Sequence, residues 1–227
     1  MTDFEQQRAS MVESQIRPNA VTDACLLAAM RALPRERFVP EKLRALAYMD
    51  ADIEVFPAID GAPARFLLAP MVLARLIQLA AVEPQDAVLD VGCATGYSTA
   101  VLASLGRSVT GLEPEPELAS AARRSLRALG LENVEIVEGA LARGHKRGGP
   151  YDVILLNGSV AEVPETLFSQ LKEGGRLAAI LSSGANAGSQ GKAYLFIKAG
   201  GEASGLPHFD AGARQLPGFL REPSFTF

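Results

Sequence analysis

The segment that most constrains the fold of this chain has the sequence VLDVGCATGY and runs from Val88 to Tyr97. Its first four residues have strand character, its middle is a turn of small residues, and a helical pattern follows. Glycines at Gly92 and Gly96 let the main chain come close to a ligand, and the start of a helix offers unpaired N–H groups. We therefore expect a nucleotide-like ligand over the carboxyl end of this strand. The alternative is a strand–turn–helix that binds nothing.

The spacing of the turn indicates which ligand it suits. A dinucleotide-binding turn needs glycine at its first, third and sixth positions, and counting from Gly92 places Ala94 third and Tyr97 sixth. Asp90 would also repel a pyrophosphate. The next predicted strand ends in Glu113, about 20 residues further on, where a carboxylate can accept both ribose hydroxyls. This combination suits S-adenosylmethionine (SAM), which carries an amine, a sulfonium and a ribose but no phosphate. The expected cofactor residues of these two strand ends are Asp90, Gly92, Cys93, Ala94, Gly96 and Glu113.

Apolar runs and helical patterns alternate along the rest of the chain. Continuous apolar strands that alternate with helices predict an α/β fold, a doubly wound and mostly parallel sheet covered on both faces. The predicted strands are 53–56, 87–91, 108–112, 134–137, 153–156, 176–181 and 193–197. The predicted helices are 3–16, 22–33 (capped by Thr22), 41–47, 70–81, 98–104, 116–129 and 164–171.

The first three predicted helices cannot bury their apolar faces alone, so we expect them to form an N-terminal helical cap. Residues 1–83 then hold this cap and a substrate-side segment, and residues 84–227 hold the SAM-binding core, both packed as one globular unit. The tail from 200 to 223 is rich in glycine and proline and could cover one edge of the sheet, with 225–227 as a closing strand.

Charge and cysteine content limit the partners. The formal charge of −4 gives no electrostatic basis for binding nucleic acid or an anionic membrane. No apolar run is long enough to span a membrane and no signal segment is visible, so we expect a cytoplasmic protein. The two cysteines, Cys25 and Cys93, have no metal-ligand spacing, and no metal site is predicted. Cys25 lies in an apolar helical pattern and is expected in the core. A monomer and a dimer are equally compatible with the sequence.

Several motifs occur along the chain in one order. They are Met11-Val12-x-x-Gln15-Ile16, Pro34-Arg35-x-x-Phe38-Val39-Pro40, Ala47-Tyr48-x-Asp50, Ala69-Pro70, the turn ending Gly96-Tyr97, Tyr151-Asp152-Val153-Ile154, Val163-Pro164-Glu165-x-Leu167 and Leu171-Lys172-x-Gly174-Gly175-Arg176-Leu177. This series resembles the protein-L-isoaspartate O-methyltransferase family, and the N-terminal motifs are not shared with methyltransferases at large.

The resemblance implies a SAM-dependent enzyme that methylates the carboxylate of isoaspartyl residues in damaged proteins or peptides. A carboxylate is already ionised at neutral pH, so it can attack the methyl group without a general base. Catalysis would then depend on positioning and on removing water from the nucleophile. The sequence accordingly identifies no catalytic residue.

Three positions depart from the family pattern. Leu68 stands where the family has a serine that helps to hold the substrate carboxylate, and the loss of one such donor costs about 1–3 kcal/mol. Gly139-Ala140 replaces a Gly-Asp whose aspartate faces the cofactor, and we expect both residues at the cofactor site, which makes eight in all. Asn157 places an amide where substrate should lie, or it only completes the end of the predicted strand 153–156. The expected substrate pocket is Leu68, Pro70 and Asn157. A methyltransferase with a small or apolar substrate, or a SAM-binding protein without turnover, are the alternatives.

Overall fold

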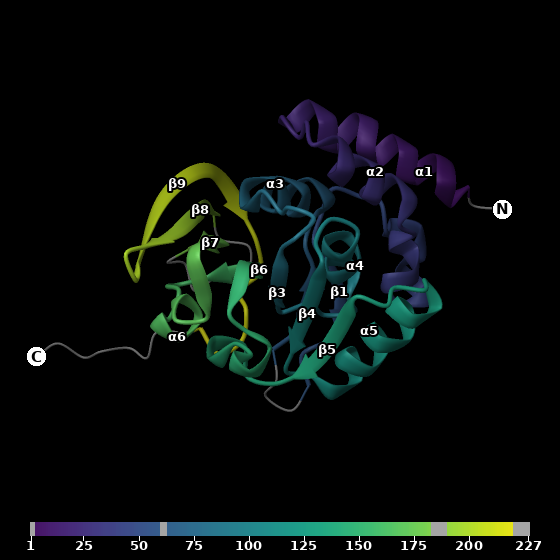
Figure 1. The fold of residues 1–227 in the computed structure, drawn as a ribbon. Coiled ribbons are helices and arrows are strands. Elements are labelled where there is room, and N and C mark those ends of the chain that lie inside the picture. The colour runs from purple at the N-terminus through teal and green to yellow at the C-terminus, as the bar shows by residue number, and fades with distance from the viewer. Residues whose placement is uncertain (1–2, 60–62, 183–189, 220–227) are drawn as a thin grey trace, which may run out of the picture.

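The computed structural model describes residues 3–59, 63–182 and 190–219, and its centre is a seven-stranded sheet with the strand order β5-β4-β3-β6-β7-β8-β9 (Figure 1). The strands are β3 (Ala87–Val91), β4 (Ser108–Glu113), β5 (Val134–Glu138), β6 (Tyr151–Val160), β7 (Leu171–Leu181), β8 (Gln190–Ala199) and β9 (Glu202–Gly212). The pairs from β5 to β7 are parallel, and β8 and β9 add antiparallel. The predicted doubly wound, mostly parallel α/β fold is confirmed. Because the strand order reverses between β3 and β6, a ligand crevice is expected at their carboxyl ends.

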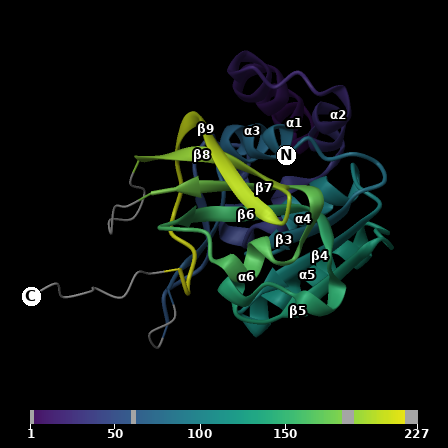
Figure 2. The same cartoon turned by 60° about the vertical axis from the view of Figure 1, so that its left-hand side comes forward.

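Six α-helices and several shorter helical turns surround this sheet within the described residues. The α-helices are α1 (Phe4–Met11), α2 (Ala24–Ala32), α3 (Pro70–Ala80), α4 (Tyr97–Ala103), α5 (Pro116–Ala128) and α6 (Glu165–Phe168). The turns are η1 (Val12–Ile16), η2 (Arg17–Asn19), η3 (Arg35–Phe38), η4 (Glu41–Leu46), η5 (Leu141–Arg143) and η6 (Lys146–Gly148). The strands β1 (Ile53–Phe56) and β2 (Arg65–Leu67) form a separate antiparallel hairpin. Helices α1 and α2 lie together at one end of the molecule in both views (Figures 1 and 2).

Alternation along each strand divides the core into two apolar clusters. On β3, Val88 belongs to the cluster built with α2 to α5, whereas Leu89 belongs to the other cluster with α6 and Leu141. Both faces of the strand are therefore buried, which explains why its sequence is apolar apart from Asp90. The second cluster also takes in Leu216 and Phe219, so the tail covers part of that face.

Local differences from the predicted elements have identifiable causes. The N-cap of α2 is Asp23, whose side chain accepts from the Leu26 amide, and not Thr22. Predicted helix 41–47 is a 3-10 turn, Glu41–Leu46. Predicted helix 164–171 shortens to α6 because Leu171 pairs with Tyr151 and starts β7. Cys25 is exposed, so its expected place in the core was wrong. The buried side chains of α2 are Leu26, Leu27, Ala29 and Met30.

The tail has two parts in the structure. Strand β9 pairs with β8 at the edge of the sheet, and residues 213–219, here called the strap, then return to the carboxyl end of β6. The Ser159 amide donates to the Arg214 carbonyl and the Leu216 amide donates to the Ser159 carbonyl, both over 2.9 Å. The closing strand predicted at 225–227 lies outside the described residues. Among the helices that are described, none has the length and apolarity to cross a membrane.

Candidate cofactor site

The glycine turn connects β3 to α4 through three residues with positive φ. Gly92 has φ +80°, Ala94 +50° and Gly96 +94°. A Cβ at Gly96 would lie 3.1 Å from the Cβ of Ala122 on α5, so glycine serves both the backbone angle and the close packing here. The Gly92 amide donates to the Leu112 carbonyl over 2.8 Å, which ties the turn to the end of β4.

Asp90 is fully buried near the end of β3 and holds the start of α4 by hydrogen bonds. It accepts hydrogen bonds from Ser98 Oγ (2.8 Å), Thr99 Oγ1 (2.6 Å) and the Asn157 amide. Burial raises the pKa of Asp90 to about 6, against the opposing effect of these hydrogen bonds. Asn157, predicted to lie at the substrate, donates its side-chain amide to Asp90 from within β6. Burial also raises the pKa of the Cys93 thiol well above its ordinary value, so this cysteine is no nucleophile.

Glu113 ends β4 beside the turn, as predicted, but its side chain is already occupied. Its two oxygens accept from Arg65 Nε (3.1 Å) and Nη2 (2.8 Å), and one of them also accepts from the Ala94 amide (2.8 Å). Glu113 is 0% and Arg65 5% exposed in their side chains. Sequence reasoning missed Arg65. The available signal was an arginine inside the apolar run of β2, where a charge has to find a buried partner.

The loop after β5 lies next to Glu113. The Gly139 amide donates to the Glu113 carbonyl over 3.3 Å, and Ala140 is the N-cap of η5. The following Leu141 meets Leu216 of the strap above Gly92. A Cβ at Gly92 would lie 2.8 Å from Leu216 Cδ2 and 3.5 Å from Leu141 Cδ1.

Two of the three expected substrate-pocket residues line a very small cavity. Leu68 is 4% exposed, and its carbonyl accepts from Arg35 Nη2 over 2.7 Å. Pro70 begins α3 and is buried. Leu68 and Asn157 line a cavity of about 10 Å³ together with Gly92 and other residues of this region. A drug-sized ligand occupies a pocket of roughly 300–1,000 Å³.

A larger open groove lies elsewhere. It measures about 700 Å³ and is formed by η3, β1 and α5. Of the glycine turn it contains only Thr95, whose hydroxyl donates to the Phe38 carbonyl over 2.5 Å. None of the eight expected cofactor residues lines it, so this groove does not replace the predicted site.

The residues expected to hold SAM therefore come together, but two other side chains lie against them in this structure. The turn, Asp90 and Glu113 have the types and positions that a ribose and a cationic ligand require. Arg65, however, occupies both oxygens of Glu113, and Leu216 fills the space above Gly92. The described residues contain no cluster of histidine, cysteine and carboxylate side chains that could hold a metal ion.

Comparison with known proteins identifies the relatives of this chain. A sequence profile of the protein-L-isoaspartate(D-aspartate) O-methyltransferase (PCMT) family matches residues 6–193. Protein-L-isoaspartate O-methyltransferase 1 of Rhodopseudomonas palustris (strain HaA2) is 38% identical over 189 residues, which are 83% of this chain and 74% of the relative.

Solved structures agree with this relationship. One named protein-L-isoaspartate O-methyltransferase is 28% identical, with a TM-score of 0.79 over 94% of this chain and 67% of its own. A protein from Plasmodium falciparum in complex with S-adenosyl-L-homocysteine (SAH) shares the fold, with a TM-score of 0.73, 21% identity and coverage of 92% and 97%. The profile match and the curated relative together place this chain in the protein-L-isoaspartate(D-aspartate) O-methyltransferase family of SAM-dependent enzymes, as its motifs predict.

Proposed function

We propose that this chain methylates the carboxylate of isoaspartyl residues in proteins or peptides. The observation that carries the proposal is the pair Asp90 and Glu113, buried at the ends of neighbouring parallel strands around the glycine turn. A carboxylate at each of these places suits a ligand with a ribose and a positive charge, and it disfavours one with a pyrophosphate. Family membership supplies the reaction class, methyl transfer to oxygen.

The acceptor chemistry agrees with the absence of a strong base from the proposed site. An isoaspartyl carboxylate is ionised at neutral pH, so the protein has only to orient it and exclude water. Asp90 is engaged by three hydrogen-bond donors, and Cys93 stays protonated. Neither side chain is free to take a proton from a substrate, and a carboxylate acceptor needs no such step.

Leu68 supports a second candidate, a methyltransferase for a small or apolar acceptor. Its buried side chain lines the small cavity beside Asn157, and leucine donates no hydrogen bond to an anion. The main-chain carbonyl of Leu68 accepts a hydrogen bond from Arg35. This wall of the proposed pocket therefore suits an apolar acceptor better than a carboxylate.

Methyl transfer from labelled SAM tests the two candidates. The acceptors are an isoaspartyl peptide, its aspartyl counterpart as a control, and a cell extract. We expect transfer to the isoaspartyl peptide at roughly a tenth to a hundredth of the rate of a serine-bearing relative, from the one missing hydrogen bond. Labelling of small molecules in the extract with none of the peptide would favour the second candidate. Equal transfer to the aspartyl peptide would contradict the proposed specificity.

A further inference from the structure

We propose that Arg65 and the strap form an internal competitor for SAM, so that the cofactor enters only when both leave the glycine turn. This inference rests on the proposed function, because SAM is the ligand that they exclude. It concerns access to the cofactor site and not the identity of the acceptor.

Arg65 competes for the carboxylate that a ribose needs. Its Nε and Nη2 donate to the two oxygens of Glu113 over 3.1 and 2.8 Å, in the forked geometry that makes arginine–carboxylate pairs strong. Ribose hydroxyls would have to donate to the same two oxygens. Since the pair is buried, water does not weaken it as it weakens a surface pair.

Leu216 competes for the space above the turn. Its Cδ2 would lie 2.8 Å from a Cβ placed on Gly92, and its Cγ would lie 2.8 Å from a Cβ placed on Gly158. Both positions lack a side chain, and Leu216 packs closely on both. Gly92 thus admits the strap to the place where a glycine turn ordinarily admits a ligand.

The two competitors lie at the same glycine. A Cβ at Gly92 would lie 3.2 Å from Arg65 Nη2 and 2.8 Å from Leu216, so both meet at this one residue. The guanidinium of Arg214 also lies 4.9 Å from the centre of the Phe66 ring, next to Arg65 on β2. The strap and the β1–β2 hairpin therefore both lie against the turn and contact each other through Arg214 and Phe66.

In this arrangement the apparent affinity for SAM equals the affinity of the open form multiplied by the fraction of molecules that are open. The strap is held by main-chain hydrogen bonds to Ser159, by the buried side chains of Ala213, Leu216 and Phe219, and by Arg214 over the Phe66 ring. Leu216 is the residue among these that packs on Gly92, so it is the one to substitute.

SAH binding, measured by calorimetry, tests the competition without requiring turnover. We expect Leu216→Ala and Arg65→Ala each to bind SAH at least about tenfold more tightly than wild type, because each raises the open fraction. Leu167→Ala is the control for Leu216, since it removes an equally buried leucine from the same cluster, on α6. Arg176→Ala is the control for Arg65, since Arg176 pairs with Asp86 at the amino end of β3. Both controls should bind SAH as wild type does.

Hydrogen exchange of the wild-type protein gives a second readout that no variant can disturb by misfolding. Saturating SAH should accelerate exchange of the Leu216 and Ser159 amides, which bond across the strap and β6. Slower or unchanged exchange at both amides, with SAH bound, would show that the strap stays in place and would overturn the competition. Equal SAH affinity in the wild type, Leu216→Ala and Arg65→Ala would overturn the competition as well, and so would the failure of all three proteins to bind SAH. If the two variants bind SAH more tightly but the protein does not methylate the isoaspartyl peptide, the proposed acceptor is wrong and the inference about cofactor access still holds.

Discussion

Substitution of Arg65 by methionine tests whether the buried pair with Glu113 exists in solution. Methionine keeps most of the length of the arginine stem and removes its charge and its donors. Glu113 would then be left, at 0% side-chain exposure, with the Ala94 amide at 2.8 Å and the Glu115 amide at 3.4 Å as remaining donors.

Removal of one partner from a buried ion pair costs about 3–5 kcal/mol, because the remaining charge stays desolvated. For a domain of this size, 1 kcal/mol corresponds to a shift of roughly 2–4 °C in the melting temperature. We therefore expect Arg65→Met to lower the melting temperature by about 6–20 °C. Thermal unfolding followed by circular dichroism at pH 7 measures this shift.

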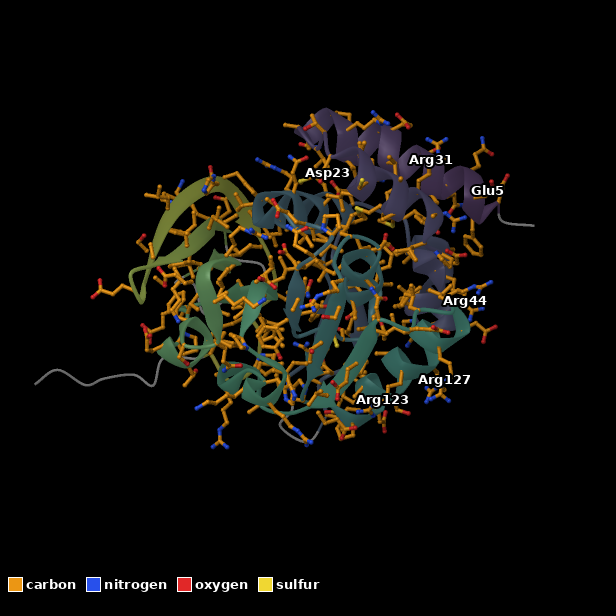
Figure 3. All side chains as sticks on the ribbon, viewed as in Figure 1. Glu5, Asp23, Arg31, Arg44, Arg123 and Arg127 are labelled. Atoms are coloured by element: carbon orange, nitrogen blue, oxygen red, sulfur yellow. The ribbon has the colours of Figure 1, made fainter. Side chains whose placement is uncertain are left out.

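Two further proteins complete the experiment. Arg123→Met removes the pair with Glu138, also 2.8 Å long but with both side chains 44% exposed, together with the hydrogen bonds from Arg123 to the Ile136 carbonyl, and should cost about 1–2 kcal/mol. Arg123 lies on the outer surface of α5 (Figure 3). In the double variant Arg65→Met, Glu113→Gln the losses should be smaller than the sum of the single ones by about 0.5–3 kcal/mol. A loss below about 1 kcal/mol for Arg65→Met would refute a buried pair and with it the closed cofactor site.

Three shorter predictions follow from the same site. The pKa of Asp90 is about 6 in the folded chain against 3.8 for a free side chain, so its contribution to stability is complete below about pH 4 and is lost as the pH rises through 6. The stability of wild type relative to Asp90→Asn, from urea unfolding, should fall by about 2 kcal/mol between pH 4 and 7, and a flat difference would contradict this. In the Arg65→Ala background, Glu113→Ala should weaken SAH binding by about 1–3 kcal/mol in calorimetry, whereas unchanged affinity would place the ribose elsewhere. NAD and NADP should not bind, because Ala94 and Tyr97 stand where a dinucleotide turn needs glycine, and a micromolar dissociation constant would disprove this.

The parts of this structure that could be predicted depend on neighbours in sequence. The bounds of β3, Ala87–Val91, were predicted to the residue, because a turn before the apolar run and a glycine after it mark both ends of the strand. Glu113 was predicted to end β4 for the same reason. Helix 164–171 failed because the pairing of Leu171 with Tyr151 is a tertiary contact that overrides local propensity.

The closure of the site could not be predicted, because its contacts join distant parts of the chain. Arg65 lies 48 positions before Glu113, and no local pattern connects the two residues. The strap is held to Ser159 by main-chain hydrogen bonds, which leave no mark in the side-chain sequence. The available clue was an arginine among apolar residues, because a buried charge needs a partner, but the sequence does not show which residue that partner is.

Leu68 and Leu216 act on different ligands, and their effects should therefore be separable. Leu68 stands at the proposed acceptor pocket, where Leu68→Ser would restore one hydrogen bond to a carboxylate. We expect this change to raise kcat/KM for an isoaspartyl peptide by roughly ten- to a hundredfold and to leave SAH affinity unchanged.

Leu216→Ala should act on the cofactor alone, through the open fraction. At SAM concentrations below saturation, the double variant Leu68→Ser, Leu216→Ala should therefore show the product of the two single effects on peptide methylation, since energies of independent sites add within about 0.5 kcal/mol. At saturating SAM the contribution of Leu216→Ala should disappear and that of Leu68→Ser should remain, because excess cofactor holds every molecule open. Initial rates with labelled SAM at both concentrations measure this, with the aspartyl peptide as the control. A Leu68→Ser effect that appears only in the presence of Leu216→Ala would contradict separate roles, and it would mean that the strap closes the acceptor pocket as well as the cofactor site.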